Sequence, residues 1–145
     1  MTWGPLPLDL DLHVMIYSEH NSTDCEVYFG NMDCPGANLD LDNRNGGNNG
    51  PETITVFDYD PDQTYMIFVH DFNPDSQHTM SKSGAKVTIY SPLLSSPEVV
   101  MVPNNGGSEK DWLIGCVQGQ DGIASLKIVN QLMNINPADN LSLCQ

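Results

Sequence analysis

The sequence predicts an all-β protein, either an antiparallel β-sandwich or a jelly roll. Three observations favour this class: about nine short β-rich segments, turn signals at intervals of about 8–12 residues, and no long amphipathic helix. No linker-like stretch divides the 145 residues, so we expect a single ligand-binding domain over residues 1–145.

The first predicted strand covers residues 8–17, where apolar residues alternate with Asp9, Asp11 and His13. An alternation of period two buries one face of a strand and gathers the polar side chains on the other. Like charges on one face repel each other unless a cation neutralises them. We expect His13 to hydrogen-bond a neighbouring carboxylate, with metal ligation as the less favoured alternative.

A second segment, residues 38–42, repeats the same leucine–aspartate alternation with Asp40 and Asp42. If it lies beside the first strand, four carboxylates meet. The other predicted strands are residues 25–29, 52–57, 65–72, 85–90, 99–103, 112–117 and 123–130. The last two form a predicted hairpin, and residues 134–143 form a tail with one helical turn after Pro137.

The stretch 38–53 reads NLDLDNRNGGNNGPET and combines carboxylates, side-chain amides and glycines. Carboxylate and amide oxygens are the ligands of calcium, and glycine lets a backbone turn tightly around an ion. The stretch has no cysteine or histidine, which argues against zinc, and it lacks the EF-hand spacing. The residues alone leave two alternatives open, a calcium site and a solvated hairpin tip.

The chain is strongly acidic, with 5 Lys and Arg against 19 Asp and Glu and a net charge of −14. This charge disfavours nucleic acid and anionic membranes, which both require a basic surface. It favours cations, although an acidic surface that only aids solubility is the alternative. We also expect no insertion into a membrane, because no apolar span is visible.

The four cysteines predict two disulfides and a secreted or cell-surface location. Four cysteines can be connected in three ways, and we expect the way in which each of the two disulfides closes a local segment. These pairs are Cys25–Cys34 and Cys116–Cys144. No catalytic motif of the serine hydrolase, zinc protease or nucleotide-binding type is present, so we expect a protein that is not an enzyme.

Three segments together resemble a known family: TWGPLPLDLDLHV (2–14), VYFGN followed by LDLDNRNGGNNGPETITV (27–56), and SGAKVTIY (83–90). They are similar to the YfaP-like family of secreted bacterial β-sandwich proteins. A weaker likeness is to the calcium-dependent peptide-binding domains of repeat-in-toxin adhesins. The resemblance covers about residues 2–90, and it implies metal ligands at Asp9, Asp11, Asp40, Asp42 and Glu52.

From these likenesses we expect a calcium-binding recognition module that acts in adhesion, as a monomeric domain of a larger secreted protein. Its expected partner is a short peptide, held through the C-terminal carboxylate by Ca²⁺ with open coordination positions. The alternatives are a lectin-like domain that binds cell-surface glycans and a structural module that calcium stiffens. The expected ligand contacts are Asn43, Asn45, Asn48, Asn49 and Asp71.

Overall fold

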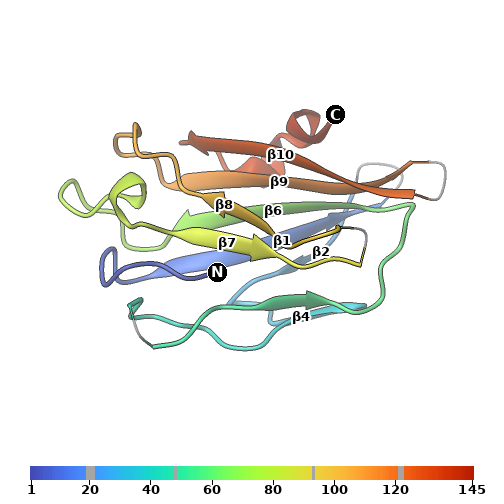
Figure 1. Cartoon of the computed structure of the whole chain (residues 1–145), viewed down its shortest axis with the longest axis horizontal. Coiled ribbons are helices and arrows are strands. Elements are labelled where there is room, and N and C mark those ends of the chain that lie inside the picture. Colours follow the sequence, from blue (N-terminus) through green and yellow to red (C-terminus); the bar gives the residue numbers. More distant parts are fainter. Residues whose placement is uncertain (19–21, 48, 93, 121–122) are drawn as a thin grey trace.

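The strands pack in two layers in this computed structural model, which describes residues 1–18, 22–47, 49–92, 94–120 and 123–145 (Figure 1). The first layer is a five-stranded antiparallel sheet in the order β10-β9-β6-β1-β2. Its strands are β1 (Leu10–Tyr17), β2 (Thr23–Val27), β6 (Thr64–Asp71), β9 (Asp111–Gln120) and β10 (Ile123–Met133).

The second layer consists of two smaller sheets, with the orders β3-β4-β5 and β7-β8. These strands are β3 (Asp33–Cys34), β4 (Ala37–Leu39), β5 (Ile54–Val56), β7 (Lys86–Ile89) and β8 (Glu98–Met101). The only helical elements of the described residues are the short 3-10 turns η1 (Met80–Lys82), η2 (Pro137–Asp139) and η3 (Leu141–Cys144). The predicted all-β sandwich is therefore confirmed.

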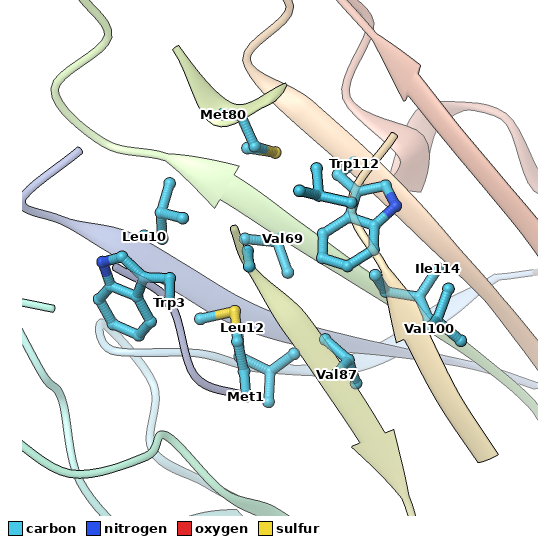
Figure 2. Close-up of a cluster of buried hydrophobic side chains, with 12 residues drawn as sticks. Met1, Trp3, Leu10, Leu12, Val69, Met80, Val87, Val100, Trp112 and Ile114 are labelled. Carbon is cyan, nitrogen blue, oxygen red and sulfur yellow. The ribbon is translucent and has the colours of Figure 1, made fainter. Parts of the chain in front are cut away.

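The main core lies between the five-stranded sheet and the β7-β8 sheet. Figure 2 shows side chains from β1, β6 and β9 that are buried in one cluster with side chains of β7 and β8. Full burial of one such aliphatic side chain contributes about 1.5–3 kcal/mol, so this cluster is a major source of stability. Its central members are Leu10, Leu12, Val69, Val87, Val100, Trp112 and Ile114.

The first predicted strand is present, but the expectation that only one of its faces is buried is wrong. All eight residues of β1 are buried. Met15 and Tyr17 face away from the second layer, in a cluster with Phe68 of β6 and with Cys144 of η3. The C-terminal turns therefore cover the outer face of the sheet, which a local alternation pattern does not report.

The predicted arrangement of the two leucine–aspartate segments is also wrong. β4 ends at Leu39, so Asp40 and Asp42 belong to the loop before β5 and not to a strand. β1 and β4 lie in different sheets, and β1 pairs with β2 and β6. Any meeting of carboxylates must therefore come from the loop.

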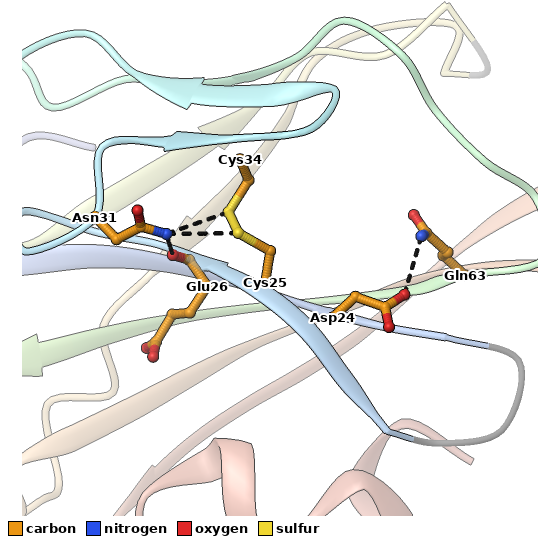
Figure 3. Close-up of a disulfide and its surroundings, with 6 residues drawn as sticks. All are labelled: Asp24, Cys25, Glu26, Asn31, Cys34 and Gln63. Atoms are coloured by element: carbon orange, nitrogen blue, oxygen red, sulfur yellow. Dashed lines mark hydrogen bonds between the residues drawn. A yellow bond between two sulfur atoms is a disulfide. The ribbon is translucent and has the colours of Figure 1, made fainter.

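Both predicted disulfides are confirmed. Cys25–Cys34 links β2 to β3 and thereby joins the two layers, and Cys116–Cys144 ties the C-terminal turn η3 to β9. Figure 3 shows the Nδ2 group of Asn31 donating to both sulfurs of the first bridge, each at 3.5 Å, and to the carbonyl oxygen of Glu26 at 2.8 Å. These contacts hold the turn between β2 and β3 against the bridge.

Candidate metal site

The first half of β1 has a strand neighbour on one side only. β6 pairs along all of β1, whereas β2 begins to pair at Val14. The loop of residues 40–53 lies at the other edge, where the Glu52 carboxylate accepts the backbone N–H of Leu12 at 2.7 Å. The second oxygen of Glu52 accepts the backbone N–H of Asn43 at 3.1 Å. Glu52 therefore fastens the loop to the start of β1.

Asparagine side chains hold the loop in shape. Asn43 donates through Nδ2 to the carbonyl oxygen of Gly50 at 2.8 Å, and its Oδ1 accepts the N–H of Asn45 at 3.2 Å. Asn49 donates through Nδ2 to the carbonyl oxygen of Gly46 at 3.1 Å. These bonds satisfy backbone groups that the irregular loop would otherwise leave unpaired.

The loop and β1 together bring three carboxylates to one point. One oxygen atom each from Asp9, Asp11 and Asp42 lies within 4.8 Å of the other two. It is the only group of this kind in the part of the chain that the structure describes. Oδ1 of Asp9 and Oδ2 of Asp11 are buried and accept no hydrogen bond. Because buried carboxylate oxygens without a partner are costly, this trio of aspartates favours a cation.

The pKa values of Asp9 and Asp11 show the same electrostatic problem. Burial, together with the charges of Asp9 and Asp42, raises the pKa of Asp11 to about 7. Burial, together with the charge of Asp42, also raises the pKa of Asp9. In the protein without a metal, the Arg44 guanidinium offsets part of this charge, since its Nε donates to Asp42 at 2.9 Å.

The donor set of the trio fits calcium. All three residues offer hard carboxylate oxygens, and calcium takes six to eight oxygen ligands at about 2.3–2.6 Å. Zinc prefers cysteine and histidine ligands, which the trio lacks. Three carboxylates fill only part of the coordination shell of calcium, so bound calcium would keep positions for water or for a ligand oxygen.

The other two predicted metal ligands lie outside the trio. Asp40 is exposed, and its Oδ1 accepts the backbone N–H of Thr53 at 3.0 Å. Glu52 is buried, and its two oxygens accept the backbone bonds described above. In the described geometry both residues hold the loop, and their direct contact with a metal stays a prediction.

The predicted ligand contacts lie at different depths. Asn43 is buried within the loop, whereas Asn45 and Asn49 are exposed at its surface. Asn48 lies outside the described residues. Asp71 pairs with Leu10 across β1 and β6, and both of its carboxylate oxygens are buried without a hydrogen bond.

Asp71 therefore adds a fourth poorly solvated carboxyl group near the trio. Burial raises its pKa to about 6, and the charges of Asp75 and Asp9 act in the same direction. The backbone N–H of Asn73 is close enough to lower the pKa, but it completes no hydrogen bond of normal geometry. The adjacent backbone is joined to the trio, because Phe72 donates its N–H to the carbonyl oxygen of Asp9 at 3.2 Å.

Two histidine–carboxylate pairs lie near the trio, because His13 and His70 share a face of the sheet with Asp11. His13 pairs through Nδ1 with Glu26 at 2.8 Å, which confirms the predicted hydrogen bond to a carboxylate. His70 pairs through Nδ1 with Asp111 at 2.8 Å, a contact that the sequence alone does not predict. His70 and Asp111 are opposite each other in the β6-β9 ladder, and a single sequence carries no signal for that register.

No protein-family model matches the chain, and neither does any curated protein. Among the described residues, no helix is long and apolar enough to cross a membrane.

A first prediction concerns pH in EDTA, with no metal bound. The pKa is raised to about 7 for Asp11, to about 8 for Glu52 and to about 6 for Asp71. The folded protein therefore keeps protons that the unfolded chain loses near pH 4. The contribution of these protonated carboxyl groups to the stability of the folded protein is complete below about pH 4 and is lost as the pH rises to about 8. Thermal melts should give a higher Tm at pH 5 than at pH 8.

The matched variant is Asp71→Asn, which removes a buried charge whose oxygens have no hydrogen-bond partner. It should raise the Tm in EDTA at pH 8 and change it little at pH 4. A Tm of the wild type that rises from pH 5 to pH 8 would contradict this account.

A second prediction concerns the glycines of the loop. Gly46 has φ of +50°, and an added Cβ would lie 2.4 Å from Nε1 of Trp3 and 2.5 Å from the carbonyl oxygen of Gly4. Gly46→Ala should therefore destabilise the protein by about 2–3 kcal/mol, measured by urea unfolding. Gly50→Ala is the control, since Gly50 has φ of +100° but no atom within 4 Å of the added Cβ, and it should cost clearly less. Equal costs would exclude the contact with Trp3 as the cause.

Proposed function

We propose that the protein is an extracellular recognition module that binds calcium and, through calcium, the free C-terminus of a short peptide, in a role such as adhesion. The observation that carries this proposal is the trio of Asp9, Asp11 and Asp42, with its buried, unpartnered oxygens. The two disulfides are compatible with an extracellular protein.

The choice of a carboxylate ligand follows from the small number of protein oxygens. A calcium ion that three aspartates hold retains open positions, and an anionic oxygen is a strong ligand for such an ion. The strongly acidic protein can therefore attract an acidic group, because the ion reverses the local charge. Calcium also competes with Arg44 for Asp42, which frees the guanidinium for a second contact with the ligand carboxylate.

The surroundings of the trio favour a peptide with an apolar last residue. Leu8 precedes Asp9, Leu41 precedes Asp42, and the backbone of Phe72 is bonded to Asp9. All three apolar side chains are exposed, at 54%, 47% and 50%. Exposed apolar side chains next to the trio in the sequence, or bonded to it through their backbone, offer contact area for a side chain adjacent to the terminal carboxylate.

The test uses a library of peptides with free C-termini, screened in calcium and in EDTA. The best binder is then compared with its C-terminal amide by isothermal titration calorimetry. Loss of the terminal charge should weaken binding at least tenfold, which corresponds to about 1.4 kcal/mol. Equal affinity of the acid and the amide would reject the terminal-carboxylate mechanism, and calcium-dependent signals on a glycan array would favour a lectin-type function.

A second candidate is a structural role, in which calcium only stiffens the sandwich. The observation that favours it is the attachment of the loop to both Leu12 of β1 and the N-terminal segment, where Gly47 donates its N–H to the carbonyl oxygen of Gly4 at 2.9 Å. A calcium-dependent Tm without any peptide or glycan binding would support this role.

A further inference from the structure

A groove separates the two sheets of the second layer. It has a volume of about 840 Å³ and lies between β5 and β7. Its floor is formed by side chains of the five-stranded sheet, among them Leu12, Val14 and Ile67. The volume is within the usual range of ligand sites, about 300–1,000 Å³.

One end of the groove already holds a piece of extended backbone. Met1 exchanges both backbone hydrogen bonds with Glu52, at 2.5 and 3.1 Å, just before β5. Thr2 exchanges both with Lys86, the first residue of β7, at 3.0 and 2.9 Å, in an antiparallel bridge. At this end the gap is therefore one strand wide, and Figure 1 shows the N-terminal end lying between β7 and the β4-β5 ribbons.

The groove-side edge of β5 continues this pattern. Asp40 donates its N–H to the carbonyl oxygen of Thr53, and Phe57 donates its N–H to the carbonyl oxygen of Gly36. The odd-numbered residues of the segment 53–57 therefore direct their backbone hydrogen bonds toward β4. Backbone groups alternate in direction along an antiparallel strand. The N–H and C=O groups of Ile54 and Val56 therefore point into the groove, as those of Glu52 do toward Met1.

The edge of β7 has the matching alternation. Val102 donates its N–H to the carbonyl oxygen of Ala85, so Ala85, Val87 and Ile89 bond toward β8. The N–H and C=O groups of Thr88 then point into the groove from the other side. A strand that runs in the direction of Met1 to Thr2 would be antiparallel to both β5 and β7 and would pair with both.

We propose that this groove binds an extended peptide segment of a partner protein, which adds the missing central strand of the second layer. The pairing of Met1 and Thr2 with the two sheets sets the direction and register of this peptide segment. Peptide residues in line with Met1 bond to β5 and place their side chains on the apolar floor, as the buried Met1 does. The intervening residues bond to Thr88 and face outward. The partner segment is therefore an alternating apolar and polar strand without proline.

The test uses the 145-residue protein and the blocked peptide acetyl-KTITVTK-amide, followed by NMR of the labelled protein. The amides of Ile54, Val56 and Thr88 should shift, and their hydrogen exchange should slow at least tenfold. The isomer acetyl-KTTIVTK-amide, in which the two apolar residues are adjacent, should bind at least tenfold more weakly. N-methylation of Ile and Val in the first peptide should also weaken binding at least tenfold, because it blocks the bonds to β5.

A matched pair of protein variants tests the edge directly. Thr88→Pro removes an N–H that faces the groove, whereas Val99→Pro removes one on the far edge of β8, opposite Thr88 in the ladder. The first variant should weaken peptide binding about tenfold, and the second should change it less than twofold. Equal binding of both peptides, no effect of N-methylation, or no binding of the alternating peptide would overturn the proposal. Binding of a small apolar molecule in place of the peptide would also overturn it.

Discussion

The Tm in 10 mM calcium is expected to exceed the Tm in EDTA by about 5–10 °C. With a dissociation constant of about 10⁻⁴ M, in the range of extracellular calcium modules, binding adds about 2.7 kcal/mol to the free energy of unfolding. A domain of this size gains about 2–4 °C per kcal/mol. Magnesium should raise the Tm much less, because it requires tighter octahedral geometry.

Variants of the trio should distinguish the effect of the buried negative charge on the Tm from the effect of metal binding on the Tm. Asp11→Asn removes the charge of a carboxylate that is only 2% exposed and lies beside Asp9 and Asp42. In EDTA it should raise the Tm, since it removes a buried, repelled charge. In calcium it should lower the Tm relative to the wild type, because the ion loses a ligand. A rise of the same size in both conditions would contradict a cation site.

The second large effect is expected at the C-terminal disulfide. Replacement of Cys116 and Cys144 by serine opens a loop with a sequence separation of 28, which the chain-entropy model values at about 3.6 kcal/mol. Calorimetry should show a Tm lower by about 10 °C. The released turns should also expose the apolar outer face of the sheet around Phe68.

The matched control for this variant is the serine replacement of Cys25 and Cys34. Its sequence separation is 9, and the same model gives about 2.7 kcal/mol. The C-terminal pair should therefore cost more, and only its loss should increase the binding of a hydrophobic dye. The reverse order of the two costs would show that the tail does not stabilise the sheet.

Most of the strands were predictable from the sequence, because each carries either its own alternation, as β1 does, or its own run of β-forming residues, as β6 does. The disulfides were predictable because each closes a local segment. The cover over the outer face of β1 was not predictable, because it comes from η3, more than a hundred residues away in the sequence.

The candidate site was predictable in part. Asp9, Asp11 and Asp42 of the two leucine–aspartate segments lie together, although a loop and not a pair of adjacent strands brings Asp42 to the other two. Asp40 lies apart because the chain leaves the strand after Leu39, and a pattern of period two does not show where a strand ends. The groove could not be predicted, because it exists only where β5 and β7 are not paired with each other, and the sequence does not show which strands stay unpaired.

Calcium is expected to bind the trio and not the neighbouring acidic residues of the same loop. Isothermal titration of the metal-free protein with calcium measures this binding, with Asp42→Asn compared against Asp40→Asn. Both variants remove one negative charge from the loop, and an asparagine at position 40 can still accept the backbone N–H of Thr53 through its Oδ1. We expect Asp42→Asn to weaken calcium binding at least tenfold and Asp40→Asn to weaken it less than threefold. Equal losses in the two variants, or no calcium binding by the wild type, would contradict this expectation.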